Sequence, residues 1–171
     1  MAAPVHRTAR RCSGLTLIEL MTMLGIVAVL AALSLPSFGA QIARHRLKTA
    51  AETLAADVAE ARFEAARRGS TLHLNYSQGP DWCWAVATAS GCDCRSAQLC
   101  QLKAVRSADH PGVQLAQSRN AHFDPAGGAA SGDGTAVLRS SHGNELRVWV
   151  SRLGHVRVCA PGAAALGYPA C

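Results

Sequence analysis

One acidic residue, Glu19, lies within the longest apolar stretch of this sequence. Residues 15–38 contain no other charged side chain, and the basic leader that precedes them, residues 1–14, ends in the small pair Ser13-Gly14. A carboxylate costs roughly 2.5–3.5 kcal/mol at the centre of a bilayer and less near its edge, so an acid in such a segment predicts a function. A basic leader, a small-residue joint and an apolar helix together are typical of a processing site.

The apolar segment is long enough to cross a membrane. Its 24 residues would rise ~36 Å as a helix, against a hydrocarbon core of ~30 Å. The leader holds three arginines and no acid, which predicts that the N-terminus stays in the cytoplasm and that the rest of the chain lies outside it. The alternative is a secretory signal peptide cut near Ala31-Ala32, which the early acid and the length of the apolar run fit poorly.

The sequence GLTLIEL, residues 14–20, resembles the prepilin-peptidase site of type IV pilins and type II secretion pseudopilins. The resemblance implies a cut after Gly14, N-methylation of Leu15, and pairing of Glu19 with the N-terminal amine of a neighbouring subunit. Leu15 stands where most of the family has Phe, and Pro36 lies where pilins commonly carry a helix-kinking proline. The implied partners are a prepilin peptidase, the inner membrane and other pilins. The domain would lie in the periplasm before assembly into a pilus or pseudopilus.

After Pro36 the pattern stays helical and becomes amphipathic, and Gly69-Ser70 is a stop signal. The charged residues, Asp57 among them, are expected on the exposed faces. The stripe expected to be buried comprises Leu47, Ala50, Ala51, Leu54, Val58, Ala61 and Ala65.

From Thr71 onward the apolar residues alternate, and Gly and Pro separate the segments, which predicts antiparallel strands. We expect an α+β fold in which a long N-terminal helix packs against a small antiparallel sheet, residues 39–171 forming one globular domain. The order of elements and the closing GHVRVC, residues 154–159, resemble the GspH/FimT-type minor pseudopilins. The expected strands cover residues 71–76, 82–89, 98–106, 113–116, 121–123, 135–139, 145–150 and 155–159, with a surface loop at 124–134.

Two cysteines bracket the C-terminal tail. Cys159 and Cys171 have no nearer partners in the sequence, so we expect them to pair, and the closed loop would contribute ~3 kcal/mol. An even set of six cysteines outside the cytoplasm predicts disulfides, once the leader and its Cys12 are removed.

The other four cysteines lie close together: Cys83, Cys92, Cys94 and Cys100. Cys83 could meet either Cys94 or Cys100. The competing hypothesis is a structural zinc site on Cys92, Cys94 and Cys100 with a histidine such as His73 or His110, although this spacing matches no common zinc pattern.

The residue pattern does not indicate an enzyme. The seven histidines are scattered, and no Ser/His/Asp set, Cys/His set or phosphate-binding glycine loop has its usual context. We therefore expect no catalytic residue, cofactor or metal. The net charge of +6 loses three positive charges with the leader, and the small remaining surplus permits contact with nucleic acid without arguing for it.

The last predicted hairpin is the one place where surface chemistry looks organised. If Leu146, Val148 and Val150 face the core, then Arg147 and Trp149 face outward, which suits phosphate contact with base stacking. The alternative is an ordinary solvated strand face.

The hairpin also carries a family pattern. DNA-binding FimT-type proteins, which serve DNA uptake in natural transformation, have a Gly-Arg-x-Arg pattern near the C-terminus, and this chain has Gly154-His155-Val156-Arg157. A histidine replaces the first arginine, and free histidine is mostly neutral at pH 7. The resemblance predicts double-stranded DNA as a partner. The alternative is a pseudopilus component of type II protein secretion that binds no DNA. The expected DNA-binding residues are Arg147, Arg152, Gly154, His155 and Arg157.

Overall fold

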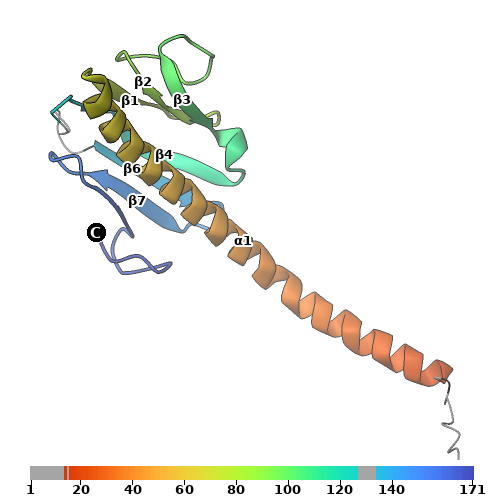
Figure 1. The fold of residues 1–171 in the computed structure, drawn as a ribbon. Helices are drawn as coiled ribbons and strands as arrows, with labels where there is room; N and C mark the ends of the chain where they lie inside the picture. Colours follow the sequence, from red (N-terminus) through yellow and green to blue (C-terminus); the bar gives the residue numbers. More distant parts are fainter. Residues whose placement is uncertain (1–13, 15, 127–133) are drawn as a thin grey trace, which may run out of the picture. The chain divides into compact units, whose positions relative to one another are not determined.

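The computed structural model describes residues 14, 16–126 and 134–171. It divides into two compact units, Met1–Phe38 and Gly39–Cys171, which we describe separately. The expected leader up to residue 13, Leu15, and most of the expected loop at 124–134 lie outside the described residues. The α1 helix (Leu17–Arg68) supplies most of the described part of the first unit and begins the second (Figure 1).

Both ends of α1 are closed by local hydrogen bonds. At its start, the Thr16 hydroxyl accepts the Glu19 backbone N–H at 3.4 Å, as an N-cap residue does. At its end, Gly69 adopts φ 64° and the Ser70 N–H donates to the Ala65 carbonyl at 3.3 Å. This is the Schellman arrangement, in which glycine takes the left-handed conformation without a Cβ penalty, and it confirms the predicted helix stop.

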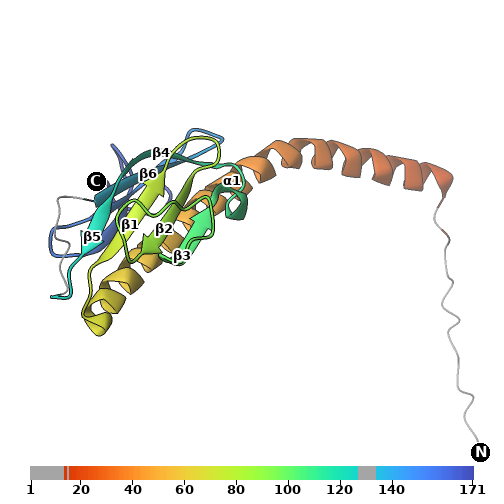
Figure 2. The same cartoon turned by 90° about the horizontal axis from the view of Figure 1, so that it is seen from above.

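The described strands form two four-stranded antiparallel sheets rather than the single sheet expected from sequence. The first sheet has the order β3 (Gln101–Arg106), β2 (Cys83–Ala87), β1 (Leu72–Ser77) and β5 (Ala121–Phe123), and Figure 2 shows these strands following one another. The second has the order β4 (Val113–Arg119), β6 (Gly134–Ser140), β7 (Glu145–Val150) and β8 (Val156–Cys159).

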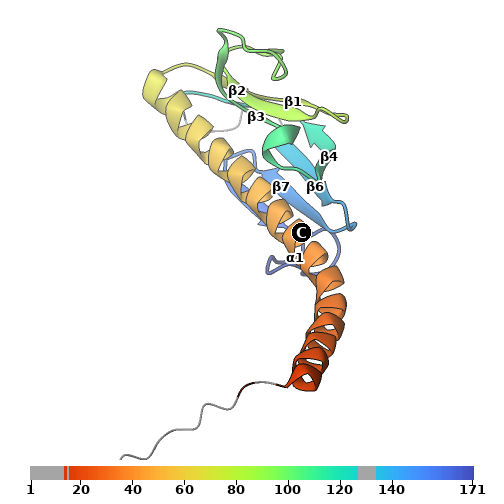
Figure 3. The ribbon, with the colours of Figure 1, turned by 90° about the vertical axis from the view of Figure 1, so that its right-hand side faces the viewer.

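The chain changes sheets at Asn120, between β4 and β5. The Asn120 side chain accepts the Tyr76 N–H at 3.0 Å, which ties the crossing point to β1. Within the second unit, α1 runs across both sheets (Figure 1 and Figure 3). The helix therefore covers the inner faces of the two sheets together.

The main core forms where the predicted helical stripe meets the inner faces of the sheets. Every residue of that stripe, from Leu47 to Ala65, is at most 1% exposed, so the prediction is confirmed. Leu72 and Leu74 from β1, and Leu146 and Val148 from β7, join the same core. Burial of one such side chain stabilises the folded state by roughly 1.5–3 kcal/mol. The apolar stripe of the helix lies against the apolar faces of the strands, so the buried side chains form one core.

The prediction that Asp57 is exposed was wrong, because partners from the first sheet compensate its burial. Its side chain is 1% exposed. The Trp84 indole N–H donates to Asp57 Oδ2 at 2.8 Å, and Lys103 Nζ lies 2.6 Å from Oδ1. Lys103 also reaches Glu60 at 3.3 Å. This cluster joins α1 to the edge strand β3, which follows only from the tertiary arrangement.

The three disulfides among the described residues join the cysteines that were predicted to pair. Cys159 pairs with Cys171 as predicted, Cys83 pairs with Cys94, one of its two expected partners, and Cys92 pairs with Cys100.

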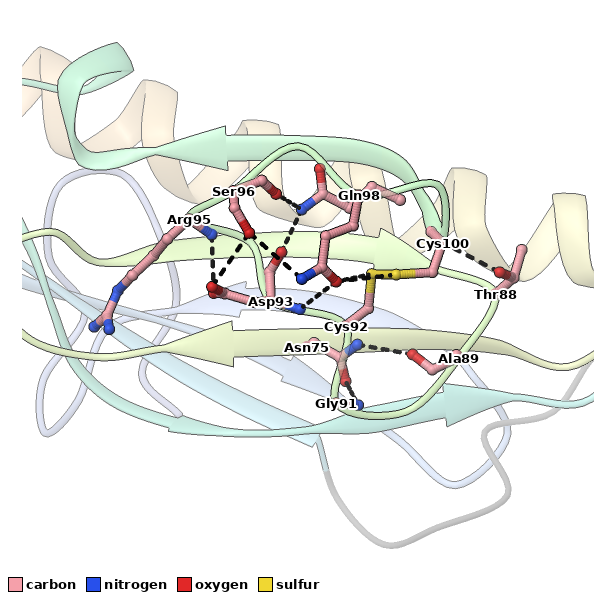
Figure 4. The surroundings of a disulfide bond; sticks show 11 residues. Asn75, Thr88, Ala89, Gly91, Cys92, Asp93, Arg95, Ser96, Gln98 and Cys100 are labelled. Atoms are coloured by element: carbon pink, nitrogen blue, oxygen red, sulfur yellow. Dashed lines mark hydrogen bonds between the residues drawn. A yellow bond between two sulfur atoms is a disulfide. The ribbon is translucent and has the colours of Figure 1, made fainter.

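The residues between β2 and β3 fold over the outer face of the first sheet (Figure 4). Asn75 anchors them from β1, donating to the Ala89 carbonyl at 3.0 Å and accepting the Gly91 N–H at 3.4 Å. Beneath them, Cys83, Ala85 and Cys94 form a second small buried cluster. The Cys83–Cys94 and Cys92–Cys100 disulfides therefore fix this segment against the outer face of the sheet.

The C-terminal tail returns along the second sheet to α1. After β8, the Ala160 N–H donates to the Pro169 carbonyl at 2.9 Å. The tip is a tight turn in which Leu166 and Gly167 both have positive φ, 57° and 84°, and the half-buried Leu166 packs against the main core. The Tyr168 hydroxyl donates to Glu52 on α1, and burial, followed by this contact, raises the pKa of Tyr168 to about 12.

Candidate processing site and nucleic-acid interface

Gly14 is exposed, and this chain's own fold does not explain why it is a glycine. A Cβ added at Gly14 would meet no atom within 4 Å. The described fold therefore sets no steric requirement for a glycine at this position. The processing prediction for Gly14 and Leu15 stays a prediction, since Leu15 is not among the described residues.

Glu19 occupies the third position of α1, within its first turn. A carboxylate there is stabilised by the helix dipole and by the unpaired N–H groups of the helix end. Glu19 is exposed, and the described part of the chain supplies it with no cation. A cationic partner, as the pairing prediction requires, would have to come from residues outside this part or from another subunit.

The β7–β8 hairpin brings three of the predicted side chains together. Trp149 is directly opposite Arg157, and Arg147 is directly opposite Cys159. Residues opposite each other in an antiparallel pair share a face of the sheet. Leu146, Val148 and Val150 are buried, so the predicted orientation of this hairpin agrees with the structure.

These residues line a groove of about 410 Å³ on the outer face of the second sheet. Arg147, Trp149 and Arg157 form one side, and the tail residues Pro169 to Cys171 form the other. None of the lining residues is acidic. The nearby Glu145 is held by Arg139 from β6 in an ion pair. Two arginine side chains and one aromatic ring therefore line the groove, and no Asp or Glu side chain does.

Arg147 has a feature that the sequence could not show. Its Nε is buried and, in the described part of the chain, has no hydrogen-bond partner. Buried donors in native structures nearly always have an acceptor, so this Nε could donate to an oxygen of a water or a bound ligand.

The rest of the predicted set lies around the hairpin turn. Gly154 has φ 74° and donates its N–H to the Ser151 carbonyl at 2.8 Å, so the turn itself requires a glycine. Arg152 and His155 are exposed on the turn. The structure thus groups Arg147 and Arg157 with Trp149, while Arg152 and His155 do not line the groove.

The sequence analysis did not predict that the tail residues Pro169 to Cys171 line the groove, or that a fourth arginine, Arg119, lies on the same face. Arg119 ends β4, a strand that was predicted to stop at Ala116 and continues beyond it after a bulge. It is opposite Thr135, which is opposite Trp149. The two-residue spacing of the polar residues Gln117 and Arg119 was a weak signal in the sequence, but only the strand register shows that Arg119 shares the face of the groove.

The zinc hypothesis was wrong because the sulfur atoms are already bonded to one another. Cys92, Cys94 and Cys100 each take part in a disulfide, which removes the thiolates that zinc needs. Neither candidate histidine lies with them: His73 is beside His122, with ring centroids 5.9 Å apart, and His110 stacks against Trp82 and Trp84.

The membrane span predicted at residues 15–38 stays a prediction. Within the described ranges, no helix combines the length and the apolar character needed to cross a membrane.

Comparisons with known proteins agree with this architecture. Residues 50–154, more than half of the chain, match the family model described as type II transport protein GspH. No curated protein matches the sequence.

Two crystal structures of the type IV minor pilin FimU from Pseudomonas aeruginosa (strain PAO1) share the fold. One superposes with a TM-score of 0.53 at 16% identity, covering 68% of this chain and 98% of FimU. The other gives a TM-score of 0.55 at 18% identity, covering 70% and 95%. With the long helix, the antiparallel sheets and the family match in agreement, this chain belongs to the GspH family of type II transport proteins and is a minor pseudopilin with a type IV pilin fold.

Proposed function

We propose that this minor pseudopilin is processed after Gly14, enters a filament of the type IV pilus or type II secretion kind, and binds DNA through the β7–β8 hairpin. The observation that supports the DNA-binding part is the groove lined by Arg147, Trp149 and Arg157 and by no Asp or Glu side chain. The maturation part is supported by the residue pattern at 14–20 and by the exposed, unconstrained Gly14.

Maturation is proposed to begin at the inner membrane. The basic leader and the apolar composition of residues 15–38 support insertion with the N-terminus in the cytoplasm and the domain in the periplasm. Prepilin peptidase then removes residues 1–14, and Leu15 is methylated. Mass spectrometry of the purified mature protein tests this step, and an N-terminus near residue 33 would instead establish a secretory signal peptide.

The proposed DNA contact is electrostatic and independent of sequence. Arg147 and Arg157 in the groove, with Arg152 and His155 at the turn, provide at most three or four phosphate contacts. Removal of one phosphate-binding charge should reduce the slope of log affinity against log salt by ~0.9 on duplex DNA, and so few contacts give only weak binding at physiological salt. We expect a dissociation constant in the micromolar range or weaker.

A mobility-shift assay with the full chain in mild detergent and duplex DNA at low salt tests this function. Arg157→Ala should weaken binding, whereas Arg106→Ala should not, because Arg106 is an exposed arginine on β3 in the other sheet. His155→Arg should strengthen binding by restoring the family pattern. Equal binding by wild type and Arg157→Ala would leave the alternative, a pseudopilus component that acts only in type II protein secretion.

A further inference from the structure

Trp149 differs from the other two tryptophans in its surroundings. Trp82 and Trp84 are at most 1% exposed, stack on each other at 5.4 Å, and donate their indole N–H groups to protein acceptors at 2.8 Å. Trp149 is half-buried, and the described residues give it neither a ring partner nor an acceptor for its N–H. The core therefore accounts for Trp82 and Trp84, while Trp149 is open to an external ligand.

The basic surface extends beyond the groove across the whole second sheet. Arg157, Trp149, Thr135 and Arg119 are successive opposite residues on β8, β7, β6 and β4. Three strand spacings of ~4.8 Å separate Arg119 from Arg157 by ~14 Å. Phosphates follow every ~3.4 Å of axis along one strand of B-form DNA, so such a row can meet more than one phosphate.

In this row the Trp149 ring, on which a base could stack, lies between the positively charged side chains of Arg157 and Arg119. Arg147 contributes a buried Nε without an acceptor beside Trp149, on the next row of the same face. A phosphate oxygen would satisfy this donor, and a base would cover the indole ring. Paired bases in a duplex present only their edges, whereas an unpaired base presents its face.

We propose that the outer face of the second sheet binds single-stranded nucleic acid, with an unpaired base stacked on Trp149 and phosphates held by Arg147, Arg157 and Arg119. This inference rests on the proposed DNA-binding function and specifies that the preferred ligand is single-stranded. Duplex DNA uses only the arginines, while a single strand gains the stacking contact and binds more tightly.

The test compares two ligands of equal charge by fluorescence polarisation with the full chain in mild detergent. Labelled oligothymidylate carries bases, and an abasic oligomer of the same length carries only the sugar–phosphate backbone. Trp149→Leu should weaken oligothymidylate binding by about 5- to 150-fold and leave abasic binding unchanged. Trp149→Tyr, which keeps an aromatic face, should retain most of the affinity.

Arg119 provides an independent measurement. Arg119→Ala should reduce the salt slope on oligothymidylate by ~0.7, and the matched variant Arg106→Ala should leave it unchanged. Unchanged melting temperatures of Trp149→Tyr and Arg119→Ala show that their folds are intact, so these two variants keep the test informative if Trp149→Leu unfolds.

The outcomes separate this inference from the function on which it rests. If Arg157→Ala weakens both oligomers while the Trp149 variants and Arg119→Ala change neither, DNA binding stands and the single-strand proposal is overturned. Equal affinity for duplex, abasic and thymidylate ligands, or equal competition by heparin, overturns it too, since the surface would then bind any polyanion. No binding of any oligomer at low salt overturns both.

Discussion

Removal of the Lys103 charge provides a direct test of how the domain stabilises its buried acid. In Lys103→Met the side chain keeps its length, but the Asp57 carboxylate, 1% exposed, loses the ammonium group at 2.6 Å. Asp57 would keep only the Trp84 hydrogen bond at 2.8 Å.

The expected magnitude follows from the exposure of the two partners. Breaking a fully buried ion pair by removing one partner costs about 3–5 kcal/mol. The Lys103 side chain is 46% exposed, so solvent screens part of the attraction, and we expect a loss of about 1.5–3 kcal/mol. For a domain of this size the loss corresponds to a decrease in melting temperature of about 5–10 °C.

A double variant separates charge from packing. In the double variant Asp57→Asn with Lys103→Met, the Asn amide oxygen still accepts the Trp84 N–H but needs no counter-charge. The double variant should therefore be at least as stable as the single variant Lys103→Met. Thermal unfolding of the four proteins at neutral pH measures this coupling. The reasoning is refuted if Lys103→Met costs less than about 0.5 kcal/mol, or if the two substitutions destabilise additively.

The pH dependence of this contact has a defined sign. Asp57 raises the pKa of Lys103 above its usual 10.5. From neutral pH up to pH 10.5 this stabilisation is therefore fully present, and it is lost as the pH rises through the raised value. At neutral pH the full effect should be observed.

Three further predictions concern the helix start, the cysteines and the stacked histidine. Glu19→Ala should reach the membrane fraction like wild type yet enter filaments poorly, and normal incorporation in a pull-down with other pilins would contradict the pairing role. Denatured, unreduced mature protein should show no thiol in a titration with Ellman's reagent, because its cysteines are paired. Burial lowers the pKa of His110 from 6.5, against the opposing effects of Asp109 and Asp57. The resulting stability is present above pH 6.5 and lost as the pH falls through the lowered value, so His110→Phe should show a smaller decrease in melting temperature between pH 7 and pH 5.

Much of the fold could be predicted because local patterns carry the information. The helical stripe from Leu47 to Ala65, the stop at Gly69 and the alternation in β7 each depend on residues a few positions apart. Such patterns determine which face of an element is apolar. The Cys159–Cys171 pairing could be predicted for a similar reason, since no other cysteine lies near either of them in the chain.

Sequence by itself determined the long helix, the strand-rich domain, the even set of cysteines and the outward direction of Arg147 and Trp149. Only the tertiary structure decided the rest: the burial of Asp57, the division into two sheets, the tail that walls the groove, and the place of Arg119 opposite Thr135. The physical reason is that these features depend on contacts between residues far apart in the chain. A carboxylate can be buried only where partners such as Trp84 and Lys103 meet it, and strand register is set by pairing across the sheet.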